Sequence, residues 1–78
     1  MSNEASHNEV LVHIDKVDKH VPKGTYTVVQ IKGWGKVPQA DELEQLIQGK
    51  LLPLPDDGSV QIDREEKFIS HPRSGSSS

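Results

Sequence analysis

The sequence contains no cysteine, so no disulfide can cross-link the fold and no thiol can act as a nucleophile or a zinc ligand. A chain of 78 residues forms one domain at most. A domain of this size buries only about 60% of the surface of its unfolded chain. We therefore expect a small core and a marginal stability that depends on packing alone.

Long apolar runs and an excess of positive charge are also missing. No run approaches the roughly 20 residues needed to cross a bilayer, and the start "MSNEASHNE" is polar and acidic, unlike a signal peptide. The net charge is −3, with acidic and basic residues interspersed, which argues against a general nucleic-acid binder. We expect a cytoplasmic protein with no nucleic-acid and no membrane partner.

Catalytic and metal-binding patterns are weak. There is no phosphate loop, no motif around a Ser-His-Asp grouping, and little room in so short a chain for an enclosed cleft. The carboxylates of "ADELE" and "DREE" fit charged surface loops. The histidines form no tight pair, although His13 and His20 could face each other across a hairpin. The sequence thus predicts no enzyme, no metal site and no cofactor held by the chain itself.

The first segments predict a flexible leader at residues 1–8 and then a β-hairpin from about Glu9 to Lys23. "EVLVHID" alternates, with Val10, Val12 and Ile14 on one face, as a half-buried strand does. Pro22 must end the second strand or place it at a sheet edge.

The stretch 25–36 supports two interpretations. Its β-branched residues favour a strand. Thr27 and Gln30, however, have the spacing of a capping box, and Val28, Ile31 and Trp34 recur every three residues. Gly33 and Gly35 then supply a stop signal. We predict a helix of about two turns.

The stretch 37–54 is also ambiguous. Asp41 could cap a helix that carries Leu43, Leu46 and Ile47, or a strand could run from about Glu44 to Gln48 and turn at Gly49-Lys50. Beyond it, "PDDGSV" is turn chemistry, "VQI" alternates, and "EEKFIS" predicts a last strand with Phe68 inward. A hairpin followed by a helix packed across the sheet is an α+β arrangement.

The second half of the chain resembles a known family. The pieces are Leu46-Ile47, the Gly49-Lys50 turn, the Asp57-Gly58 turn before Val60, "GKVP" at 35–38, and "EKFISHP" as a closing strand. Together they resemble the bacterial ubiquitin-like modifier proteins of the multiubiquitin type, over residues 9–75. The resemblance implies a ubiquitin-like β-grasp domain at 9–70, a mixed sheet with one short helix across it, and a strand at 43–48.

The resemblance also implies a role for the tail at 71–78. A deubiquitinase-like peptidase would cut before Ser76 and leave Gly75 as the mature end. A ubiquitin-activating-enzyme-like protein would adenylate that end with ATP, and a conjugating-enzyme-like protein would pass it to target proteins, in systems tied to phage defence. Pro72, Arg73 and Ser74 would be read by these partners. Ubiquitin itself ends in two glycines after two arginines, whereas this chain has only Arg73 and Gly75.

Other functions fit the same sequence. A non-conjugated β-grasp binding module would use a docking surface at Leu46, Lys50 and Trp34, although Trp34 could equally belong to the core. A sulfur carrier would carry a terminal Gly-Gly, which is absent, and a helix-turn-helix regulator conflicts with the acidic balance and with Pro53. An ordinary disordered terminus is the alternative for the tail.

Overall fold

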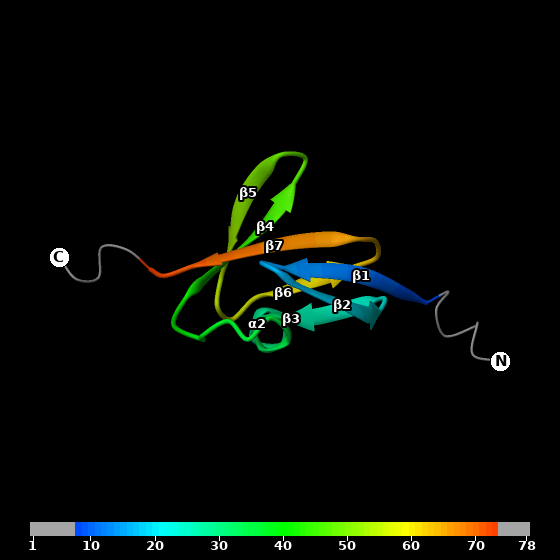
Figure 1. Cartoon of the computed structure of the whole chain (residues 1–78), viewed down its shortest axis with the longest axis horizontal. Helices are drawn as coiled ribbons and strands as arrows, with labels where there is room; N and C mark the ends of the chain where they lie inside the picture. The colour runs from blue at the N-terminus through cyan, green and yellow to red at the C-terminus, as the bar shows by residue number, and fades with distance from the viewer. Residues whose placement is uncertain (1–7, 74–78) are drawn as a thin grey trace.

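A computed structural model describes residues 8–73 of the chain. Over this range the chain forms seven strands and one helix, arranged as a five-stranded sheet in the order β2-β1-β7-β4-β5 and a two-stranded sheet of β3 and β6. The larger sheet is mixed, because β1 and β7 are parallel whereas its other neighbours are antiparallel. Figure 1 shows α2 and the β4–β5 hairpin on opposite sides of β7. The predicted α+β class is confirmed at this level.

The first hairpin is confirmed. β1 (Glu9–Ile14) pairs with β2 (Val17–Pro22), and the alternation buries Val12 and Ile14. β2 is an edge strand, which accommodates Pro22. The suggested meeting of His13 and His20 is wrong, because the register places His13 opposite Asp18 and His20 opposite Leu11.

Residues 24–34 contain both of the structures that the sequence suggested. β3 (Gly24–Thr27) is a short strand paired with β6 and was missed. The predicted helix α2 (Val28–Trp34) follows it directly and is confirmed. The Gln30 amide donates to Thr27 Oγ1 (3.1 Å) and the Thr27 amide to Gln30 Oε1 (2.9 Å), which completes the capping box.

The next hairpin resolves the second ambiguity in favour of the strand. β4 (Glu42–Ile47) pairs with β5 (Lys50–Leu54), so the helix capped by Asp41 is wrong. The two turn residues are Gln48 and Gly49, one position earlier than predicted. Both have positive φ, 52° and 81°, as tight hairpin turns require.

The last two strands close the fold. β6 (Ser59–Ile62) and β7 (Glu66–His71) follow the Asp57-Gly58 turn. β7 lies in the middle of the larger sheet, between β1 and β4, and extends to His71, one residue past the predicted end of the domain. Phe68 is only 1% exposed, so its predicted role as an inward anchor is confirmed.

The core lies between the two sheets and the helix. Its buried apolar members are Val12, Ile14, Val21, Val28, Ile31, Val37, Leu43, Val60, Ile62 and Phe68. Within residues 8–73, no helix is long and apolar enough to cross a membrane.

Candidate functional site

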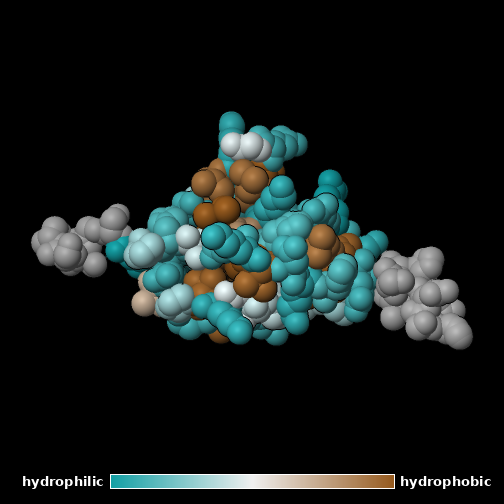
Figure 2. All heavy atoms as spheres, viewed as in Figure 1, coloured by the Kyte–Doolittle hydropathy of each residue, from teal (hydrophilic) through white to brown (hydrophobic). Residues whose placement is uncertain are grey.

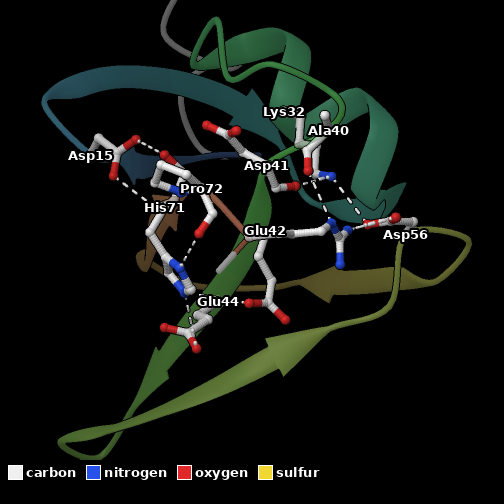
Figure 3. A network of polar contacts seen from close by, with 11 residues as sticks. Asp15, Lys32, Ala40, Asp41, Glu42, Glu44, Asp56, His71 and Pro72 are labelled. Atoms are coloured by element: carbon white, nitrogen blue, oxygen red, sulfur yellow. Dashed lines mark hydrogen bonds and ion pairs between the residues drawn. The ribbon is translucent and has the colours of Figure 1, made fainter. Parts of the chain in front are cut away.

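The end of β7 and the residues after it, Ser70–Arg73, form a segment that we call the C-terminal segment. It is held against the body by polar contacts from three separate parts of the chain (Figure 3). The segment is positioned because β7 is a central strand, hydrogen-bonded to neighbours on both sides.

The first anchor is Asp15, in the two-residue turn of the first hairpin. Asp15 adopts a positive φ of 55°, a conformation that Asp tolerates better than most residues. Its amide donates to the Phe68 carbonyl (2.9 Å), and its carboxylate accepts from the amide (2.9 Å) and the hydroxyl of Ser70. The turn of one hairpin is thereby tied to the closing strand.

The second anchor is a pair of glutamates on β4. Glu42 and Glu44 are two positions apart, so they share a face, and the register places Glu42 opposite His71. His71 Nε2 lies 3.6 Å from Glu42 Oε1 and 3.4 Å from Glu44 Oε2. Nδ1 lies 3.2 Å from the Pro72 carbonyl oxygen. Since carbonyl and ionised carboxylate oxygens can only accept, the contacts with Pro72 and Glu44 are both hydrogen bonds when His71 carries a proton on each ring nitrogen. The Pro72 carbonyl, followed by the Glu44 carboxylate, raises the pKa of His71.

The third anchor holds Arg73. Its Nε donates to the Ala40 carbonyl (2.9 Å), and its Nη2 donates to both carboxylate oxygens of Asp56, at 2.6 and 2.7 Å. Asp56 belongs to the turn that connects β5 to β6. The pKa of Asp56 is lowered, first by its hydrogen bond from Lys32 and then by the charge of Arg73.

Lys32 holds the residues of this third anchor in place from the interior of the protein. Its side chain is 1% exposed, although it carries a charge. Nζ donates to the carbonyls of Gln39 (3.0 Å) and Asp41 (2.7 Å) and to Asp56 Oδ1 (3.2 Å). These oxygens satisfy the buried ammonium and fix the 39–41 loop and Asp56 in the places where Arg73 meets them.

These contacts hold a strand end against the body through exposed, charge-assisted hydrogen bonds, and a second carboxylate could replace Asp56 as the partner of Arg73. In residues 8–73, one group has the ligand types for a divalent cation, namely Glu42, Glu44 and His71. A protonated His71 between two carboxylates accounts for the same geometry. The prediction of no metal site considered only the spacing of histidines and did not anticipate this group.

The predicted tail residues divide at the edge of the described range. Pro72 and Arg73 lie within it, whereas Ser74, Gly75 and Ser76 lie outside the described residues. Arg73 was expected to be read by partner proteins, and here its guanidinium meets Asp56 of its own chain. Its recognition by a partner stays a prediction.

The predicted docking residues do not form one surface. Leu46 is half-buried on β4 and Lys50 is exposed at the start of β5. Trp34 ends α2, on the other side of β7 in Figure 1. It packs against the core and edge-on to Tyr26, with ring centroids 4.8 Å apart.

Sequence reasoning missed the anchors Asp15, Lys32 and Asp56. Lys32 had a usable signal, since positions 28, 31 and 32 share a helix face and the first two are apolar. Asp15 and Asp56 had no local signal, because their partners are 55 and 17 residues away. The carboxylates of "ADELE" are also more than loop charges, because Glu42 and Glu44 form part of β4 and face His71.

Comparisons with known proteins supply no relative. No protein-family model matches the chain, and no curated protein or solved structure matches it. Function is therefore argued from the residues and their geometry.

Proposed function

We propose that the chain is a ubiquitin-like protein modifier that is joined to target proteins through the carboxyl group of Gly75. The observation that carries the proposal is the path of β7. The strand runs through the middle of the sheet and brings an exposed segment, Pro72-Arg73, to the surface two residues before Gly75. A modifier needs this arrangement, because its end must enter an active site on another protein while its body stays folded.

The element order supports the β-grasp form of this proposal. The chain runs through an N-terminal hairpin, the short strand β3, a short helix, a second hairpin, the short strand β6 and a closing strand. The closing strand is parallel to the first. In the larger sheet the first and last strands, β1 and β7, are neighbours, with β2 outside β1 and the β4–β5 hairpin outside β7. This is the order expected of the β-grasp fold that the sequence resembles.

The tail chemistry supports the modifier role. Pro72 fixes its own φ and biases His71 toward extended backbone, which suits a narrow active-site channel. The Arg73 side chain is 42% exposed, so a partner can reach its guanidinium. Glycine at position 75 leaves its carbonyl open to close approach.

In this account the body of the protein catalyses nothing. A deubiquitinase-like peptidase hydrolyses the bond between Gly75 and Ser76. An activating-enzyme-like protein uses ATP to adenylate the new carboxylate, which releases pyrophosphate. The Gly75 acyl group then passes, with loss of AMP, by way of a conjugating-enzyme-like protein to an amine of a target protein, where it forms an amide bond. These partners act on the end of the chain and require no pocket in the modifier itself.

The proposal is tested by expressing an N-terminally tagged chain in cells of the organism that encodes it. We expect slower-migrating, tag-positive adducts with the natural chain and with a Ser78→Glu control, because position 78 lies beyond the proposed cut. Gly75→Glu should abolish the adducts. Adducts that persist with Gly75→Glu, or that are absent from all three chains, would contradict the proposal.

A second candidate is a β-grasp binding module that is joined to nothing. The observation that favours it is the attachment of Arg73 to Asp56 and Ala40, which ties the segment to its own body. A module of this kind should keep its partners after Gly75→Glu, whereas a modifier should lose its conjugates.

A further inference from the structure

A hollow of about 380 Å³ lies between the tip of the β4–β5 hairpin and the connection from β6 to β7. Leu46 and Ile47 line it from the hairpin. Asp63, Arg64 and Glu65 line it from the connection, and Glu66 lines it from the start of β7. We call this feature the hairpin hollow. It is separate from the anchors of Arg73, which lie at Ala40 and Asp56.

The apolar side of the hollow belongs to the same face of the β4–β5 hairpin that contributes Leu43 to the core, but it lies farther along the hairpin, where the side chains are exposed. Cross-strand partners on β4 and β5 share a face, so Leu43 and Leu54 point the same way as Gln45 and Leu52. Leu43 is fully buried, whereas Leu52 is 45% exposed and Ile47, further along, is 39% exposed. The hairpin therefore extends past the core and leaves apolar side chains uncovered. Figure 2 shows hydrophobic side chains gathered where this hairpin stands out from the body.

The other side of the hollow is acidic and held in place. Asp63, Glu65 and Glu66 oppose the single charge of Arg64, so the lining carries three negative charges against one positive charge. Glu66 accepts from Gln45 Nε2 (3.0 Å), Glu65 Oε2 lies 2.6 Å from His13 Nε2, and Asp63 accepts from Gln61 Nε2 (3.2 Å). These contacts fix the carboxylates beside the exposed apolar side chains instead of leaving them free in solvent.

We propose that the hairpin hollow binds a peptide segment of a partner protein in which a large aliphatic or aromatic side chain stands next to lysine or arginine. The apolar side chain contacts Ile47, which lies on the same face of the hairpin as Leu43 and Leu52, and the basic group meets Asp63 and Glu65. Charge complementarity selects this occupant over a second copy of the chain, because each copy carries a net charge of −3 and like charges oppose association. The inference goes beyond the proposed function, since it holds whether or not Gly75 is ever conjugated.

The test uses the full 78-residue chain and a phage-displayed library of random decapeptides. We expect enrichment of peptides that combine a large apolar residue with neighbouring Lys or Arg. The best peptide, made synthetically, should shift the NMR amide signals of residues 46–48 and 61–66. Its Kd should rise at least tenfold for Ile47→Ser and for Asp63→Lys.

Matched controls separate the hollow from general surface effects. Val29→Ser replaces an apolar residue that is 52% exposed on α2, and Asp57→Lys reverses an exposed charge in another turn. Both should leave the Kd within about twofold, and urea unfolding must show that every variant is folded. The proposal is overturned if the library enriches acidic peptides or none, or if the peptide shifts only NMR amide signals of other residues. It is also overturned if the control substitutions weaken peptide binding as much as Ile47→Ser and Asp63→Lys do. A dimer that dissociates in Ile47→Ser, detected by analytical ultracentrifugation, would make a second copy the occupant instead.

Discussion

Single side chains set how firmly the C-terminal segment is held and how that hold responds to pH. Asp56 and His71 are the two titratable groups at the centre of these contacts. The positive charges of Lys32 and Arg73 lower the pKa of Asp56, whereas the carbonyl of Pro72 and the carboxylate of Glu44 raise the pKa of His71. The contribution of Asp56 to stability therefore changes at a pH below 3.8, and that of His71 changes at a pH above 6.5.

Replacing Asp56 with Asn should destabilise the protein at neutral pH and have less effect in acid. The pKa of Asp56 is lower in the folded chain than its ordinary 3.8, so its stabilising effect is present above that value. The effect is lost as the pH falls through the lowered folded pKa. The measurement is the urea midpoint at neutral pH and well below 3.8, with Asp57→Asn as control. An equal difference between Asp56→Asn and the natural chain at both pH values would contradict this assignment.

Replacing His71 with Gln should matter most in mild acid. The folded pKa of His71 is raised above its ordinary 6.5, so protonated His71 stabilises the fold fully below that value. This contribution disappears as the pH rises through the higher folded pKa. Urea midpoints on both sides of the transition, with the edge-strand substitution His20→Gln as control, measure it. A loss that is larger at alkaline pH than in mild acid would have the wrong sign.

At the scale of elements, the helix approaches the first strand through a glycine. A Cβ on Gly35 would lie 2.3 Å from Cγ2 of the buried Ile14, whereas a Cβ on Gly33 would meet nothing within 4 Å. The short helix can thus tolerate a larger residue inside its last turn but not at its C-cap, which packs on β1.

The matched pair Gly35→Ala and Gly33→Ala tests this packing. We expect Gly35→Ala to lower the free energy of unfolding by about 1–3 kcal/mol, the usual cost of overpacking a core. Gly33→Ala should raise it by up to about 1 kcal/mol, because Ala is the better helix former. Thermal and urea unfolding give both numbers. Similar effects for the two substitutions would show that Gly35 is not a packing contact.

Elements with a clear local pattern could be predicted from the sequence. The alternation of Val10, Val12 and Ile14 identified β1, and the Thr27–Gln30 capping box identified α2. Periodicity failed for β4, because Leu43, Leu46 and Ile47 fit a helical face as well as a strand. A helix over that segment would not place Glu42 opposite His71, as the strand does. The four-residue β3 was missed because the capping box and the three-residue spacing that follow it favoured a helix.

The candidate site was only partly visible in the sequence. Arg73 and Pro72 were singled out from the tail pattern. Their anchors depend on tertiary contacts between residues far apart in the chain, such as Asp15 with Ser70 and Asp56 with Arg73. No local spacing in the sequence predicts such contacts, so only the three-dimensional structure shows them.

At the scale of the whole molecule, one small core supports both the C-terminal segment and the hairpin hollow. Phe68 is central to it, because it is fully buried on β7, the strand that leads to the C-terminal segment. Damage to this core should loosen the segment and the sheet together.

Phe68→Ala should therefore unfold much of the population. Truncating a buried Phe costs about 3–5 kcal/mol, a large part of the roughly 5–15 kcal/mol by which domains are stable. Ile69→Ala is the control, because Ile69 is the next residue on β7 and is 39% exposed. Circular dichroism melts should show a large loss for Phe68→Ala and a small one for Ile69→Ala. Comparable melts for both variants would mean that Phe68 is not the anchor of the fold.

The central claim is that the chain is a modifier with Gly75 as its mature end, and intact mass tests it most directly. The chain is expressed with an N-terminal tag in the organism that encodes it, purified, and weighed by mass spectrometry beside a Gly75→Glu variant. The account predicts that the natural chain loses Ser76, Ser77 and Ser78 and that the variant keeps them. A natural chain that retains every residue through Ser78, with no adduct on any other protein, would contradict it.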